Sequence, residues 1–203
     1  MKRSNVAGIN FALLTWSDLT SLTGKLAEEI QKDSRLIQYD RIVALANGGL
    51  TMVRYLADHL NIKTINLLQI SAYDSVAQQM PEPVLLQPLA INVSGEKILV
   101  FEDIVDSGAT LKVVDNYFAA LGVKEYKVAA QIQKSKAVRS ADYVGEQIDD
   151  WIIFPYETFE TIRDLNNQWL AKNLPESEIR ENLKTIGFNE TEIDAGLIEA
   201  KNH

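Results

Sequence analysis

One stretch, residues 97–111, constrains the fold of this chain more than any other. It reads Lys-Ile-Leu-Val-Phe-Glu-Asp-Ile-Val-Asp-Ser-Gly-Ala-Thr-Leu. The apolar run 97–101 follows a Ser-Gly pair and predicts a buried strand. From Leu111 to Leu121, apolar residues repeat at helical spacing and predict a helix that Gly122 ends. A strand, a short polar loop and a helix in this order leave backbone N–H groups at a helix N-terminus, where an anion can bind.

Phosphate-binding and acidic residues occur together in this loop. The small polar run 107–110, Ser-Gly-Ala-Thr, lets a phosphate approach the backbone and adds hydroxyl donors. Glu102, Asp103 and Asp106 lie beside it, although carboxylates repel a phosphate. A ligand that combines a phosphate with hydroxyl groups and a metal ion, such as a sugar phosphate, accounts for both kinds of residue.

Residues 98–111 resemble the phosphoribosyl pyrophosphate (PRPP) signature of the type I phosphoribosyltransferases, since their hydrophobic, acidic and small positions all agree with it. The resemblance implies that Glu102 and Asp103 hold the ribose hydroxyls and bind Mg²⁺, which bridges ribose and pyrophosphate oxygens. It further implies that Asp106 acts at the purine N7, as a base or a hydrogen-bond partner. The 5′-phosphate would be cradled by Ser107, Gly108, Ala109 and Thr110.

A second unit of strand, loop and helix precedes the signature. Residues 42–46 predict a strand, Asn47-Gly48-Gly49 follows, and apolar residues between 50 and 60 predict a helix. By the resemblance this is the pyrophosphate-binding loop, in which a basic residue usually precedes the glycines. Asn47 holds that position here and offers hydrogen bonds without charge. The PRPP-binding residues that the resemblance implies are Asn47, Gly48, Gly49, Glu102, Asp103, Asp106, Ser107, Gly108, Ala109 and Thr110.

Between these two units lies a polar segment. Residues 63–70 predict a strand, and the chain is then polar as far as Pro88, a length typical of a lid or a disordered loop. Its first residues, Ser71-Ala-Tyr73-Asp, resemble the start of the mobile catalytic hood loop of purine phosphoribosyltransferases. The resemblance therefore implies catalytic roles for Ser71 and Tyr73 beside Asp106. Residues 89–93 are expected to form the strand that ends this loop.

Residues 125–132 predict a further strand, and Lys134 follows it. Asp-Tyr-Val at 142–144 and Asp-Trp-Ile-Ile-Phe-Pro-Tyr-Glu at 150–157 narrow the resemblance to bacterial xanthine–guanine and archaeal-type hypoxanthine phosphoribosyltransferases. A lysine can donate to a 6-oxo group, an aromatic ring can stack on a purine, and main-chain groups can read the remaining edge. The base-binding residues implied are Lys134, Trp151 and Ile152. Taken alone, Trp151 also suits a hydrophobic core and Lys134 a solvated surface.

The alternation of strands and helices predicts an α/β fold: a mainly parallel sheet with helices on both faces and a ligand site at the carboxyl ends of the strands. An amphipathic helix is expected from about Thr15 to Asp33, and another over residues 158–172. Residues 176–186 and 190–200 predict a helical hairpin with Asn189 as a cap. We expect residues 1–172 to form the phosphoribosyltransferase-like domain and residues 173–203 a small helical C-terminal extension.

Composition limits the partners of this protein. Its 28 acidic and 20 basic residues give a net charge of −8, which argues against nucleic acid. The absence of cysteine excludes disulfides and thiolate sites, and two histidines are too few for a histidine-rich metal site. No apolar run approaches membrane-spanning length, so we expect no membrane partner and a cytoplasmic location. The resemblance implies small-molecule substrates, PRPP and a purine base, and a homodimer or a higher homo-oligomer.

The activity that the resemblance implies is transfer of a phosphoribosyl group from PRPP to hypoxanthine, guanine or xanthine, with release of pyrophosphate, in purine salvage. Asn47 motivates an alternative, a non-catalytic regulatory protein of the same fold that binds a nucleotide or PRPP. A third hypothesis is a transferase for adenine or a pyrimidine. Lys134 argues against adenine, because the 6-amino group of adenine is itself a donor.

Overall fold

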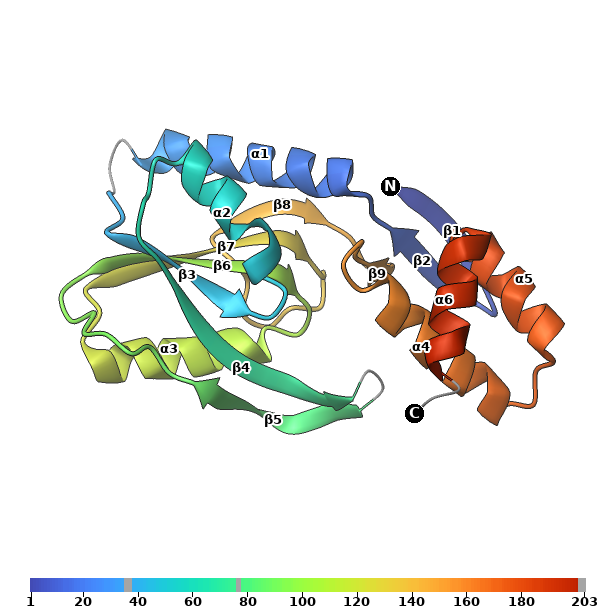
Figure 1. Cartoon of the computed structure of the whole chain (residues 1–203). Coiled ribbons are helices and arrows are strands. Elements are labelled where there is room, and N and C mark those ends of the chain that lie inside the picture. Colours follow the sequence, from blue (N-terminus) through green and yellow to red (C-terminus); the bar gives the residue numbers. More distant parts are fainter. Residues whose placement is uncertain (35–37, 76–77, 201–203) are drawn as a thin grey trace. The chain divides into compact units, whose positions relative to one another are not determined.

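The computed structural model describes residues 1–34, 38–75 and 78–200 of the 203 (Figure 1). Contacts between residues divide the chain into two compact units. The larger is Leu19–Asp149, and the smaller combines Met1–Asp18 with Asp150–His203. The division predicted from the sequence, at residues 172 and 173, does not coincide with these limits.

The larger unit is built on a six-stranded sheet in the order β5-β4-β3-β6-β7-β8. The neighbouring strands are parallel except β4 and β5, which are antiparallel. Because parallel strands end at the same edge, the loops after β3, β6 and β7 begin side by side. The strands are β3 Arg41–Ala46, β4 Ile65–Ser75, β5 Gln78–Gln87, β6 Lys97–Val105, β7 Glu125–Gln133 and β8 Tyr143–Gln147.

Helices cover both faces of this sheet, as the sequence predicts. They are α1 Trp16–Ser34, α2 Leu50–His59 and α3 Ala109–Leu121, and Figure 1 shows α3 on the opposite side of the sheet from α1 and α2. In the central strand β6, Ile98 and Val100 pack with Phe118 of α3, while Leu99 and Phe101 are equally buried. A strand buried on both faces explains the continuous apolar run in the sequence.

Three local expectations need correction. Strand β6 continues past the acidic pair to Val105, because its pairing with β7 extends that far. Most of the polar run after residue 70 forms an antiparallel hairpin of β4 and β5 rather than a loop. The strand predicted at residues 89–93 is wrong: this segment pairs with no strand, and its Leu89 N–H donates to the hydroxyl of Tyr117 at 2.8 Å.

The smaller unit has a three-stranded sheet in the order β1-β2-β9, with β1 Lys2–Val6, β2 Ile9–Leu13 and β9 Trp151–Ile153. Strands β1 and β2 form an antiparallel hairpin, and β2 pairs with β9 in parallel. Its helices are α4 Thr158–Ala171, α5 Glu176–Ile186 and α6 Glu190–Ala200. One hydrophobic core joins these elements: Val6, Phe11, Ile153, Ile162, Leu165, Trp169, Ile179, Leu183, Ile186, Phe188, Ile193 and Leu197.

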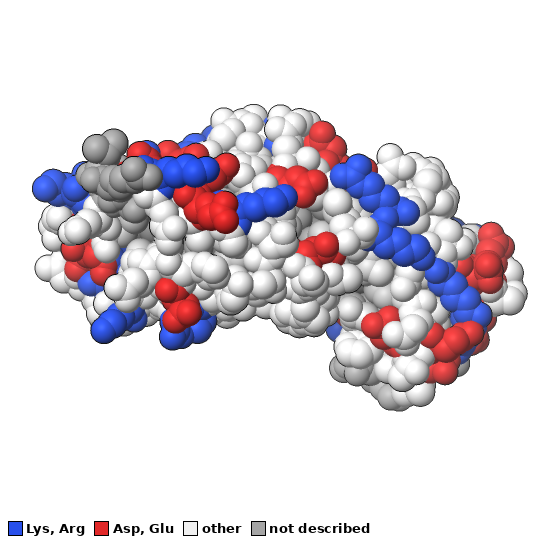
Figure 2. Space-filling model, turned by 90° about the horizontal axis from the view of Figure 1, so that it is seen from above, with Lys and Arg blue, Asp and Glu red and all other residues white. Residues whose placement is uncertain are grey.

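The predicted C-terminal hairpin is confirmed, together with its cap. The amide of Glu192 donates to Asn189 Oδ1 at 3.0 Å, and the amide of Asn189 donates to a carboxylate oxygen of Glu192 at 2.9 Å. Arg180 of α5 forms an ion pair with Asp194 of α6 at 2.8 Å. Figure 2 accordingly shows basic and acidic side chains beside one another on the face that it presents. No helix within the described ranges combines the length and the apolar character needed to cross a membrane.

Candidate active site

The acidic pair lies near the carboxyl end of β6, in the middle of the larger sheet. Asp103 is only 6% exposed, and its Oδ1 accepts a hydrogen bond from the amide of Ile104 at 2.8 Å. Glu102 is half-buried. Burial, and then the neighbouring carboxylate of Asp103, raise the pKa of Glu102 well above its usual value. A cation or a group of hydroxyl donors would therefore relieve repulsion between these two acids.

The loop after β3 lies directly against Asp103. A Cβ atom on Gly48 would come within 1.9–2.4 Å of the Asp103 carboxyl atoms, and one on Gly49 would come within 2.7 Å of the carbonyl oxygens of Leu45 and Phe101. Only glycine allows so close an approach at either position. Asn47, joined to Ala46 by a cis peptide bond, is exposed. The structure thus brings the predicted pyrophosphate loop and the acidic pair together.

Two helices begin at this edge of the sheet without a side-chain cap. The residue before α2 is Gly49 and the residue before α3 is Gly108, and neither helix has a side-chain hydrogen bond at its N-cap. The first N–H groups of a helix have no partner within the helix, and the helix dipole makes them attractive to an anion. In the loop after β3, however, the amides of Gly49, Leu50 and Thr51 already donate to backbone carbonyls, so the attraction for an anion there comes from the positive end of the α2 dipole.

In the loop after β6, Gly108 has a positive φ of 81° and lies against the backbone of Arg139. A Cβ atom at residue 108 would come within 2.4 Å of the Arg139 carbonyl oxygen and 2.8 Å of its nitrogen. Ser107, Ala109 and Thr110 are partly exposed around it, and Ser107 Oγ accepts from the Ala109 amide at 3.3 Å. These residues keep the small, polar surface that the sequence predicts for a phosphate.

Residues 134–139, which we call the 134–139 loop, run alongside the end of β6 and the phosphate loop. The amide of Lys134 donates to the carbonyl of Val105, and the amide of Val138 donates to that of Ser107, both at 2.9 Å. Between these two contacts, Lys136 Nζ lies 2.9 Å from Asp106 Oδ1. The sequence interpretation missed this arrangement, although a second lysine two residues after Lys134 was a usable signal.

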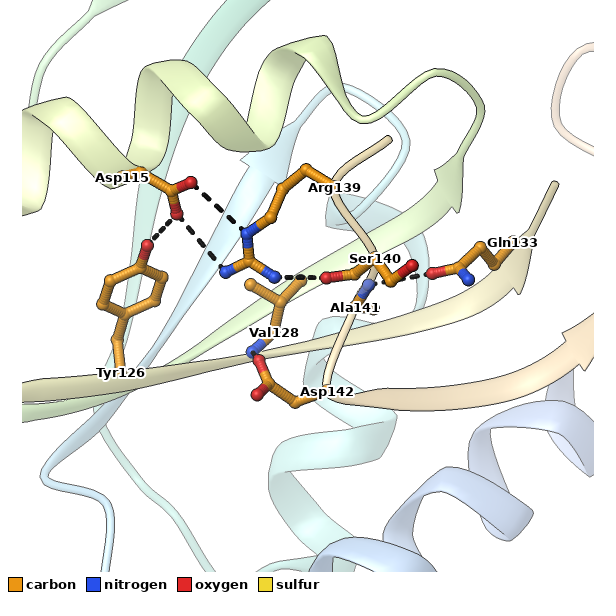
Figure 3. Close-up of polar contacts among 8 residues, drawn as sticks. All are labelled: Asp115, Tyr126, Val128, Gln133, Arg139, Ser140, Ala141 and Asp142. Atoms are coloured by element: carbon orange, nitrogen blue, oxygen red, sulfur yellow. Dashed lines mark hydrogen bonds and ion pairs between the residues drawn. The ribbon is translucent and has the colours of Figure 1, made fainter. Parts of the chain in front are cut away.

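A polar cluster ties the 134–139 loop to α3 and β7 (Figure 3). Arg139 contacts both carboxylate oxygens of Asp115 at 3.3 Å, and the hydroxyl of Tyr126 donates to the same carboxylate. Burial and the hydrogen bond to Asp115 raise the pKa of Tyr126 to about 12. The Ala141 amide donates to Gln133 Oε1 at 2.8 Å. These contacts hold the loop in place against Gly108.

The predicted base-binding residues divide between the two units. Lys134, at the end of β7, is buried to 8% exposure, so it is not a solvated surface lysine. Trp151 in β9 is 48% exposed, so it is not a core residue, whereas Ile152 is buried. Strand β9 is an edge strand of its sheet, which leaves main-chain groups on one side unused by the described strands. Each position, within its own unit, suits the role that the sequence suggested.

The predicted hood residues lie in β4. Ser71 is half-buried and pairs with Val84 of β5. The backbone of Tyr73 pairs with Gln79, and the side chain of Tyr73 lies outside the described part of the structure. Their catalytic roles remain predictions.

A parallel α/β sheet with two glycine-containing anion loops and an acidic pair at its carboxyl edge defines a class of phosphate-ligand-binding proteins. Residues 12–159 match the phosphoribosyl transferase domain family, and the chain belongs to that family. It is 27% identical over 145 residues to a xanthine-guanine phosphoribosyltransferase of Idiomarina loihiensis, with 71% of this chain and 85% of the relative covered. It is 24% identical over 169 residues to a hypoxanthine-guanine phosphoribosyltransferase of Staphylococcus aureus, with 80% of this chain and 89% of the relative covered.

Among solved structures, the purine phosphoribosyltransferase of Pyrococcus horikoshii is similar to this chain with a TM-score of 0.63 and 26% identity. The similarity covers 72% of this chain and 94% of that structure. The sequence and structure comparisons together confirm the family that residues 98–111 predicted.

Proposed function

We propose that this protein is a purine phosphoribosyltransferase, which transfers the phosphoribosyl group of PRPP to a 6-oxopurine and releases pyrophosphate in purine salvage. The observation that carries this proposal is the contact of the Asp103 carboxylate with Gly48, which joins the acidic pair to an anion loop. The named relatives act as xanthine-guanine and hypoxanthine-guanine phosphoribosyltransferases, and this supports the same substrate class here. The cytoplasmic location and the homo-oligomer remain predictions.

The residues of the larger unit suit a displacement at the anomeric carbon of ribose. Such reactions pass through a transition state that resembles an oxocarbenium ion, so positive charge develops on the sugar. Glu102 and Asp103 would hold the ribose hydroxyls and place negative charge near that carbon. The loop at Gly48, with the positive end of the α2 dipole, would lie at the pyrophosphate. The loop around Gly108 would bind the 5′-phosphate, and Asp106 would accept the proton at the purine N7.

The acidic pair also fits Mg²⁺. Magnesium binds oxygen ligands, keeps several waters and needs only one or two carboxylates from a protein. Glu102 and Asp103 supply two. Burial, and then the charge of Asp103, raise the pKa of Glu102, and a cation would offset both effects. In the described part of the chain, no cluster of three or more acids and histidines is arranged to hold a metal by itself. When bound, the ion would neutralise charge on the departing pyrophosphate.

The base would be recognised by a donor and by an aromatic surface. A buried lysine such as Lys134 can form a charge-assisted hydrogen bond to a 6-oxo group. The exposed ring of Trp151 can stack on a purine, and Ile152 can offer its main chain. We expect Trp151→Ala to weaken purine binding by about 1–3 kcal/mol, the usual effect of losing base–aromatic stacking, while Trp151→Phe retains most of it. An unchanged Michaelis constant for the purine in Trp151→Ala would contradict this role.

One assay tests the proposed function directly. The protein is incubated with PRPP, Mg²⁺ and either hypoxanthine, guanine or xanthine, and nucleotide formation is followed by absorbance. Adenine serves as the control base. Turnover of at least one 6-oxopurine, well above that of adenine, is expected. If the protein binds a nucleotide but converts none of the three bases, it is the regulatory protein rather than the enzyme.

A further inference from the structure

The two anion loops of this site contain no basic residue. From Ile98 to Leu111 the chain has three acids and no lysine, arginine or histidine, and Asn47-Gly48-Gly49 is neutral. PRPP is highly charged, and backbone N–H groups compensate charge less strongly than a cation does. The proposed Mg²⁺ would neutralise charge at the pyrophosphate, and at the 5′-phosphate a side chain from outside these loops can provide the positive charge.

Lys136 provides a cation at the phosphate loop. Its Nζ lies 2.9 Å from Asp106 Oδ1, at the start of that loop. The backbone on both sides is held to the same strand and loop, through Lys134 to Val105 and through Val138 to Ser107. The ammonium group is thereby kept near residues 106–108, while the side chain itself is 66% exposed and can change its rotamer.

The contact of Lys136 with Asp106 is easily exchanged for another. Ion pairs between partly exposed side chains contribute little to folding, because solvent screens them and two side chains must be ordered. The Asp106 side chain is 31% exposed, so this pair is of that kind. A phosphate offers more charge and more acceptor oxygens than one carboxylate, so the ammonium gains by moving to it.

We propose that Lys136 is a further phosphate-binding residue, whose ammonium group moves from Asp106 to the 5′-phosphate of PRPP when the substrate binds. This inference rests on the proposed function and deepens it. The move has a second consequence, because it removes one cationic partner from the Asp106 carboxylate, which the proposed function places at the N7 of the purine. Binding of PRPP would thus prepare the Asp106 carboxylate to accept the N7 proton of the purine.

The test compares Lys136→Gln with two controls. Lys136→Arg keeps the charge at the loop. Lys124→Gln makes the same change in net charge at an exposed residue just before β7, at the opposite edge of the sheet. Dissociation constants are measured by calorimetry for three probes: PRPP with Mg²⁺, ribose 5-phosphate, and inorganic pyrophosphate with Mg²⁺. Michaelis constants for the purine are measured in parallel.

For Lys136→Gln we expect the dissociation constants of PRPP and of ribose 5-phosphate to rise about tenfold, because one charge-assisted hydrogen bond to phosphate is lost. Pyrophosphate, which lacks the 5′-phosphate, should bind as it does to the wild type. Lys136→Arg should retain most of the affinity, and Lys124→Gln should retain all of it. The thermal midpoint should move little, because the Lys136 side chain is largely exposed.

Three results would overturn the inference while leaving the proposed function intact. Lys136→Gln could bind PRPP and ribose 5-phosphate as the wild type does, or it could change only the Michaelis constant of the purine. An equal loss of pyrophosphate affinity would also overturn it, because the lysine would then act at the other loop. Absence of turnover in the wild type is a failure of the proposed function, and the binding measurements still decide the role of Lys136.

Discussion

The two anion loops of the larger unit look alike in sequence but depend on glycine for different reasons. Each follows a parallel strand and opens a helix that has a glycine at its N-cap. In the loop after β3, neither Gly48 nor Gly49 has a positive φ, and the demand is for space. The space beside Gly48 is filled by the side chain of Asp103. In the loop after β6, Gly108 needs both a positive φ and space beside the main chain of Arg139.

This difference separates two kinds of constraint. Crowding by a side chain can be relieved by changing that side chain, whereas crowding by a backbone, combined with a positive φ, cannot. The side chain that crowds Gly48 is also one of the two proposed ribose and Mg²⁺ ligands. Gly48, in the loop after β3, is therefore constrained by a side chain that is proposed to bind ligand. Gly108, in the loop after β6, is constrained by the backbone of the 134–139 loop.

The largest effect is expected from the acidic pair. Glu102→Gln combined with Asp103→Asn should leave the fold intact and weaken PRPP binding in the presence of Mg²⁺ at least a hundredfold. Each charge-assisted hydrogen bond contributes about 1.5–3 kcal/mol, and two are lost. Calorimetry on the double variant and the wild type measures this. If PRPP affinity is unchanged, the glycine loops bind the substrate without the acids, and the assignment of the acids is wrong.

Substitutions of the glycines test directly whether Gly48 is crowded by a side chain and Gly108 by a backbone. Gly48→Ala and Gly108→Ala should each destabilise the protein by about 1–3 kcal/mol, as overpacking does. Adding Asp103→Gly to Gly48→Ala should restore most of the stability, because the crowding atoms belong to that side chain. Adding Arg139→Ala to Gly108→Ala should restore none, because the crowding atoms are main-chain oxygen and nitrogen.

Urea denaturation of the single and double variants measures these changes, with Asp103→Gly and Arg139→Ala alone as controls. Equal recovery in both double variants would show that the two loops have the same constraint. The variants with Asp103→Gly should not recover PRPP binding even where they recover stability.

A smaller change is expected at Asn47, where the loop after β3 lacks the basic residue of its family. Asn47→Arg should lower the Michaelis constant for PRPP about tenfold, because a bond to a charged group contributes about 1.5–3 kcal/mol before the cost of ordering the side chain. Turnover should change less, since the contact exists in the ground state as well as the transition state. Weaker PRPP use by Asn47→Arg would mean that this position is not at the pyrophosphate.

The smallest effect concerns the stability of the protein without ligand or metal. The raised pKa of Glu102 means that its ionised form is disfavoured in the folded state. The wild type should therefore lose stability as the pH rises from the ordinary glutamate value through the raised one, whereas Glu102→Gln should not. At neutral pH we expect Glu102→Gln to be more stable, by about 1 kcal/mol, the equivalent of a pKa shift of roughly one unit, because the amide carries no charge beside Asp103.

Thermal unfolding in a chelating buffer, from pH 4 to pH 8, checks this prediction. The difference between the two proteins should shrink toward acid pH, where the wild-type carboxyl is protonated in both states. A difference independent of pH would show that packing, rather than ionisation of Glu102, separates them. The gain in stability should accompany a loss of PRPP binding.

The sequence alone determined the features that depend on neighbours along the chain. The helices α2 to α6 are local patterns of apolar residues, glycine and caps, and they were predicted closely. The family was visible for the same reason, because residues 98–111 are continuous. The meeting of the two glycine-containing loops and the acidic pair could be anticipated, since the carboxyl ends of parallel strands meet at one edge of a sheet.

Tertiary structure alone decided the features that depend on residues far apart in sequence. The pairing of β2 with β9 joins residues 11–13 to residues 151–153, and no local pattern records it. The polar part of the β4–β5 hairpin, after residue 70, was not predicted, because its pairing joins residues of two strands and no apolar pattern marks it. The contact of Lys136 with Asp106 and the burial of Lys134 likewise follow from where the 134–139 loop lies. Side-chain burial and ion pairing are set by the packed neighbours in space, and those neighbours are known only once the chain has folded.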